Sequence, residues 1–226
     1  MLALWLVVGS AVGFGVVAIA VPYAYVKLGG PGIRRSAPRS DGAIGLSFDD
    51  GPDPIATPQI LDVLAAAGVR ATFFVTGEAA DAHPDVMRRL VAEGHEVASH
   101  GYRHRHALLQ RWPLEGFFDT RKALRRLGGA RMYRGPYGKY SWSVLAALRL
   151  HRVQPVNWSI EAHDWHPAFT PRDVVAKVVG EARPGAVIVM HDRGRGARRC
   201  VAALRPILDG LAAKQLRAMP LSELWS

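Results

Sequence analysis

The stretch Ala186-Val187-Ile188-Val189-Met190 is an unbroken apolar run, and the polar pair His191-Asp192 follows it directly. A strand that is buried on both faces reads as a continuous apolar run, whereas a strand with one exposed face alternates apolar and polar residues. Strands of the first kind are typical of parallel sheets, in which helices cover both faces. This stretch therefore predicts a central strand of a parallel α/β sheet.

Upstream and downstream of this run, short apolar segments alternate with helical patterns. The expected strands are residues 43–48, 71–75, 96–99, 131–134, 155–160, 186–190 and 217–220. The expected helices are residues 57–67, 84–93, 114–127, 143–150, 171–181 and 201–214. This alternation predicts one α/β domain with about seven or eight parallel strands, in a sheet that is either open or closed into a barrel.

The composition is that of a globular protein with a moderately basic charge balance. The 226 residues are 49% hydrophobic and 21% charged, which argues against a disordered chain. The single cysteine, Cys200, excludes an internal disulfide and a cysteine-rich zinc module. The net charge of +10 favours an anionic partner such as a membrane surface, a cell-wall polymer or nucleic acid. Because the arginines are scattered and no aromatic-basic platform is present, we expect no nucleic-acid partner, and the sequence indicates no obligate protein partner.

The N-terminal segment is apolar and long enough to cross a bilayer. Residues 1–26 contain no charged side chain, and about 20 apolar residues span a membrane. We expect residues 1–27 to form a transmembrane anchor. A cleaved signal segment is the alternative, since Ala18-Ile19-Ala20 is similar to a signal cleavage site. Residues 28–41 are rich in Gly, Pro, Ser and Arg and predict a linker, which leaves residues 42–226 as the folded domain.

Polar clusters follow five of the expected strands, at the strand ends where α/β folds carry their chemistry. These clusters are residues 48–54, 99–104, 134–138, 158–165 and 190–192. Each cluster alone has a structural explanation as a turn or a solvated loop. Their shared position at the ends of parallel strands predicts that they converge on one site.

Two of the clusters indicate a divalent metal site. Asp49 and Asp50 are adjacent carboxylates that repel each other, and a nearby cation offsets this repulsion, although a simple turn would also use Asp, Gly and Pro. His100 and His104 are spaced so that both imidazoles can face one ion, and a basic solvated loop is the alternative. Two histidines and Asp50 would form an open site suited to zinc, cobalt or another divalent metal.

The other clusters predict groups that act around the metal. His191 ends a hydrophobic strand and can donate a proton to a leaving group. Arg134 among carboxylates can hold one of them charged and oriented, and the backbone N–H groups after Pro136 could bind an oxyanion. Trp165 follows another strand and could form one wall of a groove, although tryptophans are more often core residues.

In this order, the five clusters resemble the motifs of the polysaccharide deacetylase family, which is also called carbohydrate esterase family four or the NodB-homology domain. The resemblance covers roughly residues 43–225. It implies a distorted parallel (β/α) barrel and a zinc-like divalent ion bound by Asp50, His100 and His104. It further implies that Asp49 is the general base and His191 the general acid.

The resemblance also implies roles for the residues around this pair. Arg134 would orient Asp49, Asp164 would support the catalytic pair, the backbone N–H of Tyr137 would help to bind the oxyanion, and Trp165 would line the substrate groove.

The sequence departs from the family pattern at two positions. Family members usually carry Ser or Thr after the first metal histidine, where the hydroxyl steadies the metal-binding loop, and Gly101 cannot do so. The fourth motif usually begins with Asp, whereas this chain has Glu161. Either Glu161 or Asp164 is therefore the acid that contacts the catalytic groups.

The implied activity is hydrolysis of N-acetyl groups from an amino-sugar polymer such as peptidoglycan or a chitin-like oligosaccharide. The alternatives are deacetylation or deformylation of a lipid-linked amino sugar at the inner leaflet, and an inactive carbohydrate-binding module. We expect a membrane-anchored protein with its catalytic domain outside the cytoplasm, as in wall-acting family members. The basic residues Lys27, Arg34, Arg35 and Arg39 after the apolar segment favour the opposite orientation.

Overall fold

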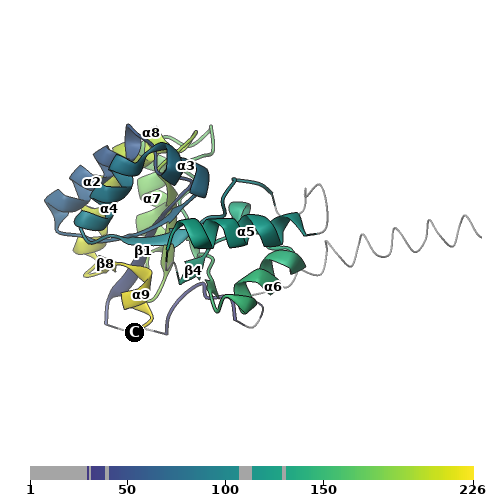
Figure 1. The fold of residues 1–226 in the computed structure, drawn as a ribbon. Helices are drawn as coiled ribbons and strands as arrows, with labels where there is room; N and C mark the ends of the chain where they lie inside the picture. The colour runs from purple at the N-terminus through teal and green to yellow at the C-terminus, as the bar shows by residue number, and fades with distance from the viewer. Residues whose placement is uncertain (1–29, 31, 39–40, 107–113, 129–130) are drawn as a thin grey trace, which may run out of the picture.

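The computed structural model describes residues 30, 32–38, 41–106, 114–128 and 131–226, and in them eight parallel strands form one curled sheet (Figure 1). The strand order is β5-β4-β3-β2-β1-β7-β6, and β8 pairs with β1 beside this path. The strands are β1 Ala43–Asp49, β2 Thr72–Val75, β3 Glu96–Ser99, β4 Met132–Tyr133, β5 Gln154–Pro155, β6 Ile160–Glu161, β7 Val187–His191 and β8 Arg217–Met219. The expected parallel α/β fold with seven or eight strands is confirmed, as a half-barrel in which β5 and β6 occupy opposite ends of the order.

Strand β1 lies at the centre of the sheet, and all seven of its residues are buried. One edge pairs with β7 over Gly45–Asp49. The other edge is divided, since β8 pairs with Ala43–Gly45 and β2 with Ser47–Asp49. The register with β7 sets Asp49 opposite His191, so the ends of these two strands carry their polar side chains at the same place.

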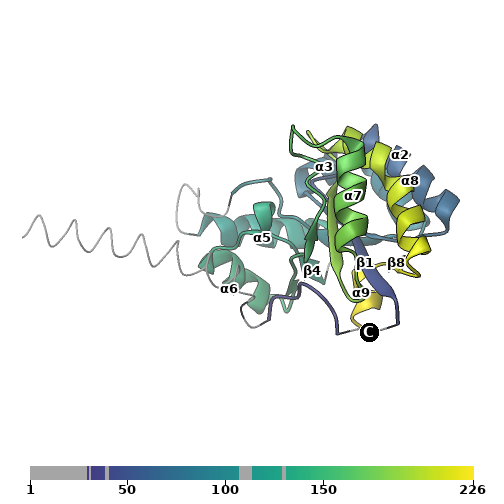
Figure 2. The same ribbon diagram turned by 180° about the vertical axis from the view of Figure 1, so that it is seen from behind.

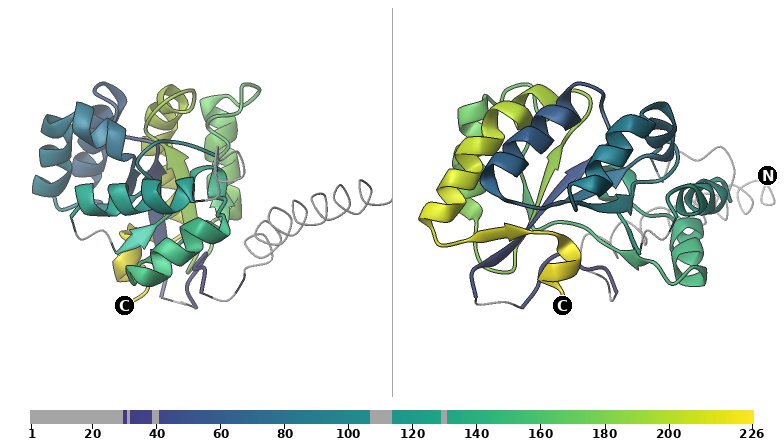
Figure 3. Two further views of the ribbon diagram at one scale, coloured as in Figure 1. Left: turned by 45° about the vertical axis from the view of Figure 1, so that its right-hand side comes forward. Right: turned by 60° about the vertical axis from the view of Figure 1, so that its left-hand side comes forward.

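Helices pack around the outside of the sheet, and Figure 2 shows α7 and α8 side by side. The helices are α2 Ala56–Ala67, α3 Gly77–Ala82, α4 Pro84–Ala92, α5 Glu115–Arg126, α6 Trp142–Leu150, α7 Pro171–Glu181, α8 Ala197–Ala213 and α9 Leu221–Leu224. The largest buried cluster joins alternate residues of β1 (Ile44, Leu46 and Phe48) to apolar side chains of α2, α7 and α8. Helices α5 and α6 pack on each other beyond β4 (Figure 3).

The structure corrects two expected elements. The single strand expected over residues 155–160 is wrong, because the chain crosses from one sheet edge to the other within it. The Val156 N–H donates to Tyr133 of β4, whereas the Ser159 N–H donates to Val187 of β7, so two short strands form instead. Helix α3 was not expected. Thr76 begins it by accepting a hydrogen bond from the backbone N–H of Ala79.

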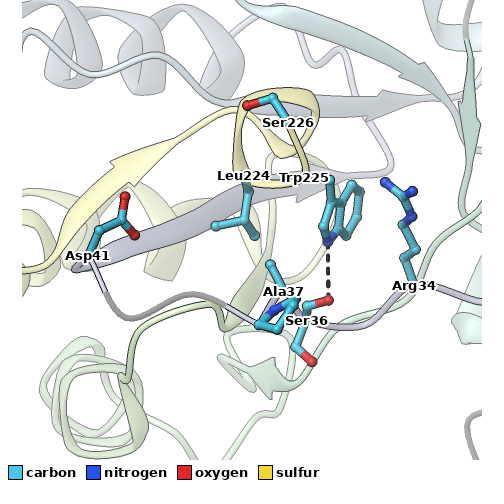
Figure 4. Close-up of a pocket in the computed structure, with 8 residues that line it drawn as sticks. Arg34, Ser36, Ala37, Asp41, Leu224, Trp225 and Ser226 are labelled. Carbon is cyan, nitrogen blue, oxygen red and sulfur yellow. Dashed lines mark hydrogen bonds between the residues drawn. The ribbon is translucent and has the colours of Figure 1, made fainter.

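Part of the expected linker packs against the domain. Arg34 forms an isolated bridge with Val156 and Ser36 forms one with Ala186, so residues 33–38, here called the arm, lie between β5 and the start of β7. Figure 4 shows the Trp225 indole donating to the Ser36 carbonyl, with Arg34 beside the ring. The arm and the C-terminal residues line a surface pocket of about 510 Å³ at the end of β1 opposite to Asp49.

The expected membrane anchor at residues 1–27 lies outside the described residues. Among the helices that the structure describes, none combines the length and the apolar character needed to cross a bilayer.

Candidate active site

The C-terminal ends of the strands bring the predicted residues together. Asp49 ends β1, His191 ends β7, His100 directly follows β3 and Arg134 directly follows β4. The sheet register places Asp49 beside His191 and Ser99 beside Tyr133, which fixes the spacing of these strand ends. The site residues form three groups: a triad of one carboxylate and two imidazoles, and two buried pairs that are each joined by a hydrogen bond.

The triad consists of Asp50, His100 and His104. The Asp50 Oδ1 atom lies 3.2 Å from His100 Nε2 and 3.0 Å from His104 Nε2. Burial by itself would raise the pKa of Asp50, but hydrogen bonds from the two imidazoles outweigh it and hold this pKa well below its usual value. One ligand atom from each residue lies within 4.8 Å of the others, and two imidazoles with one carboxylate suit zinc or cobalt. The residues present therefore fit a divalent ion.

The histidines of the triad are held by contacts away from the metal-facing atoms. The His100 Nδ1 atom lies 2.8 Å from the Arg134 carbonyl oxygen, which can only accept, so Nδ1 carries a proton and Nε2 is the ring atom that faces Asp50 and would bind an ion. The His104 ring packs against the Tyr137 ring, with 4.7 Å between the ring centroids. His100 is thus fixed by a hydrogen bond and His104 by an exposed aromatic contact.

The first buried pair is Asp49 with Arg134. Arg134 Nη1 donates to Asp49 Oδ1 at 2.7 Å and to Ser47 Oγ at 2.9 Å, and both charged side chains are buried. The Ser47 hydroxyl in turn donates to the Ile188 carbonyl at 2.6 Å. The guanidinium also lies over the Phe74 ring, 4.0 Å from its centroid. These contacts fix one carboxylate oxygen of Asp49 against the sheet.

The second buried pair is His191 with Asp164. The Asp164 carboxylate accepts from His191 Nδ1 at 2.7 Å and from the His191 backbone N–H at 2.7 Å, so Nε2 is the ring nitrogen that Asp164 does not use. Burial by itself would lower the pKa of His191. The hydrogen bond and charge of Asp164, aided by the charges of Asp50 and Asp49, raise it to about 9.

The structure distinguishes the two acids of the fourth cluster. Asp164 contacts His191, whereas Glu161 accepts a hydrogen bond from the Trp165 indole at 2.9 Å. Trp165 is 42% exposed, and Tyr137, which adopts a φ of 58°, is 57% exposed. Their expected roles at the groove and the oxyanion stay predictions.

Ser47 and Asp192 are parts of the site that the sequence analysis did not assign. Ser47 precedes Asp49 by two residues, and the alternation of a strand places both on one face, so this signal was available. Asp192 is fully buried and accepts from the Gly51 N–H at 2.9 Å and from the Thr57 hydroxyl at 2.7 Å. Burial raises the pKa of Asp192 to about 7. Gly51 and Thr57 precede Asp192 by 141 and 135 residues. No local sequence pattern reveals contacts over such separations.

Several known proteins are similar to this chain over most of its length. A chitooligosaccharide deacetylase of Sinorhizobium fredii is 40% identical to the chain over 167 residues, which cover 70% of this chain and 77% of that protein. The solved structure of a peptidoglycan N-acetylglucosamine deacetylase in complex with 4-naphthalen-1-yl-N-oxidanyl-benzamide is 30% identical, with a TM-score of 0.79. That match covers 90% of this chain and 96% of the other.

Another similar structure is a family 4 acetyl xylan esterase of Clostridium thermocellum in complex with a cobalt ion. It is 26% identical with a TM-score of 0.73, and the match covers 80% of this chain and 89% of the other. The sequence model described as polysaccharide deacetylase matches residues 36–156. With this match and the 40% identity above, the chain belongs to the polysaccharide deacetylase family.

Proposed function

We propose that the chain is a metal-dependent hydrolase that removes N-acetyl groups from an amino-sugar polymer such as peptidoglycan or a chitin-like oligosaccharide. The observation that carries the proposal is the position of the triad beside the Asp49–Arg134 and His191–Asp164 pairs. The deacetylase names of two similar proteins support the choice of an N-acetyl sugar as substrate.

Asp50, His100 and His104 would hold the divalent ion, with zinc or cobalt as the best match to their donor atoms. When bound, such an ion polarises the acetyl carbonyl and makes water a stronger nucleophile at neutral pH. The remaining chemistry comes from the two buried pairs.

Asp49 accepts a proton from the attacking water, and Arg134 holds its carboxylate in the required direction through Oδ1. His191 donates a proton from Nε2 to the departing amine nitrogen as the bond between nitrogen and the acetyl carbon breaks. Asp164 fixes the ring orientation and favours the protonated form of His191, in which it can act as the acid. We assign oxyanion binding to the backbone N–H of Tyr137, and one wall of the substrate groove to Trp165.

The test is acetate release by the full-length chain from N-acetylglucosamine oligomers and from peptidoglycan, with and without a chelator. We expect release that stops on chelation, returns with zinc or cobalt, and is absent in Asp50→Ala. Activity that survives both chelation and Asp50→Ala would refute the metal mechanism. The full chain is required because removal of residues 1–40 would delete the arm.

We also propose that residues 1–27 anchor the protein in the membrane and that the catalytic domain, residues 42–226, lies outside the cytoplasm. The uncharged N-terminal sequence supports the anchor, and the family's action on wall polymers supports the orientation. In intact spheroplasts, added protease should digest the domain. Full protection until lysis would reverse the orientation and favour a lipid-linked amino sugar as the substrate.

A further inference from the structure

The loop between the two metal histidines has a glycine where a hydroxyl is expected. Gly101 follows His100 directly and adopts a φ of 83°, a conformation that side chains disfavour. The loop therefore lacks the serine or threonine hydroxyl that the family pattern led us to expect. Another group must hold the short segment that connects His100 to His104.

Asp119 of helix α5 provides such a group. Its Oδ2 atom accepts from the Tyr102 backbone N–H at 2.9 Å, and its Oδ1 atom accepts from the Arg103 backbone N–H at 3.3 Å. Both carboxylate oxygens are thus used by consecutive residues of the loop. Hydrogen bonds from backbone N–H groups to a carboxylate are stronger than those between neutral groups.

The glycine and the carboxylate fit each other sterically. A Cβ atom at Gly101 would lie 3.2 Å from Asp119 Oδ2, which is closer than ordinary van der Waals contact. The same Cβ would lie 3.5 Å from the Tyr133 hydroxyl. The absence of a side chain at Gly101 therefore leaves the space that the Asp119 carboxylate occupies.

The carbonyl side of the loop is held by a different element. The Gly101 and Tyr102 carbonyls accept from the backbone N–H groups of Gly77 and Glu78, each at 2.9 Å, at the start of α3. Asp119 accepts from the N–H groups of the next two residues, Tyr102 and Arg103. The Gly101 N–H donates to the Ser99 hydroxyl at 3.4 Å. The loop is thus held through its carbonyl groups by α3 and through its N–H groups by Asp119, up to Arg103, the residue before His104.

From these contacts we infer that Asp119 is a positioning residue for the metal site and replaces the missing hydroxyl after His100. It touches neither the ion nor the substrate, and it acts by fixing the loop that sets the distance between His100 and His104. The inference rests on the proposed function, because it requires a divalent ion at the triad.

The experiment compares cobalt binding by the full-length wild type, Asp119→Ala and Asp119→Asn, measured by titration of the metal-free proteins and by the visible absorption of bound Co²⁺. Asp173→Ala is the matched control. Asp173 also accepts a hydrogen bond from a backbone N–H, that of Thr170, but it lies on α7. Thermal unfolding of each metal-free protein reports on the fold independently of the metal.

We expect Asp119→Ala to weaken cobalt binding about 10-fold, at the low end of the range for groups that orient metal ligands. Its Co²⁺ spectrum should also change, because the geometry of the two imidazoles is less fixed. Asp119→Asn keeps one acceptor oxygen and should recover most of the affinity. Asp173→Ala should unfold at a lower temperature than the wild type and yet bind cobalt with unchanged affinity.

Cobalt affinity and spectrum equal to wild type in folded Asp119→Ala would overturn the inference. If Asp119→Ala does not fold, Asp119→Leu decides, because leucine fills similar space but offers no acceptor to the Tyr102 and Arg103 N–H groups. A cobalt affinity and spectrum equal to wild type in that variant would overturn the inference. If the wild type binds no cobalt or zinc, the proposed function fails instead, and the two failures are thereby distinguished.

Discussion

The proton-transfer residues and the metal triad occupy the same end of the sheet, but they are held in different ways. In the two pairs, the Arg134 and Asp164 side chains are completely buried and Asp49 is 3% exposed, and each pair is joined by hydrogen bonds of 2.7 Å. The fourth member of the pairs, His191, is 18% exposed. In the triad, the His100 side chain is only 2% exposed, but the His104 side chain is 31% exposed and the Asp50 side chain 25%. The geometry of the two pairs is therefore built mainly into the packed sheet, whereas two of the three triad residues, Asp50 and His104, lie on partly exposed loops.

The largest effect should come from Asp49→Asn. This variant distinguishes the buried pairs from the triad, because it should lower turnover without loss of the metal. This change removes the proposed general base and should lower turnover by about 10²–10⁴-fold while the metal is retained. His100→Ala should abolish turnover and lose the metal as well. Acetate release and elemental analysis of the purified variants provide the two measurements. Metal absent from Asp49→Asn but present in His100→Ala would show that the roles are reversed.

The next effect concerns stability in the absence of metal. Arg134→Met leaves the buried Asp49 carboxylate without its cation, and the loss of one partner of a buried ion pair costs about 3–5 kcal/mol. His104→Ala removes a partly exposed ring from a loop and should cost much less. Urea unfolding of the metal-free proteins measures both. Equal losses in the two variants would contradict the division of the site into a packed part and a loop part.

The smallest expected effect is a change in pH dependence. Despite burial, the Asp164 carboxylate raises the pKa of His191 to about 9, so the imidazole is protonated below this pH, and the proposed acid is lost as the pH rises through that value. Asp164→Asn removes the charge that raises this pKa, and the alkaline limb of the rate profile should therefore move to lower pH. An unshifted limb in a folded, metal-loaded variant would exclude His191 as the group that titrates there.

The sequence predicted those features that depend on local patterns. The apolar run before His191 and the carboxylates after residue 48 identified strand ends, and parallel strands bring such ends together. The split of residues 155–160 into β5 and β6 was missed because their apolar pattern does not reveal which neighbouring strand each residue pairs with. Two further contacts join elements that are distant in sequence. Asp192 binds Gly51 and Thr57, and Asp119 binds the loop between the two histidines of the triad. They became visible only in three dimensions.

The arm between β5 and β7 has a consequence for the order in which the chain assembles. Its partners lie far along the sequence, since Ser36 bridges to Ala186 and accepts a hydrogen bond from Trp225, which is 189 residues away. During synthesis, the arm emerges from the ribosome long before its partners at β7 and Trp225. Contacts of such high sequence separation form slowly. The contacts of the arm with Ala186 and Trp225 therefore cannot form until those residues have been synthesised.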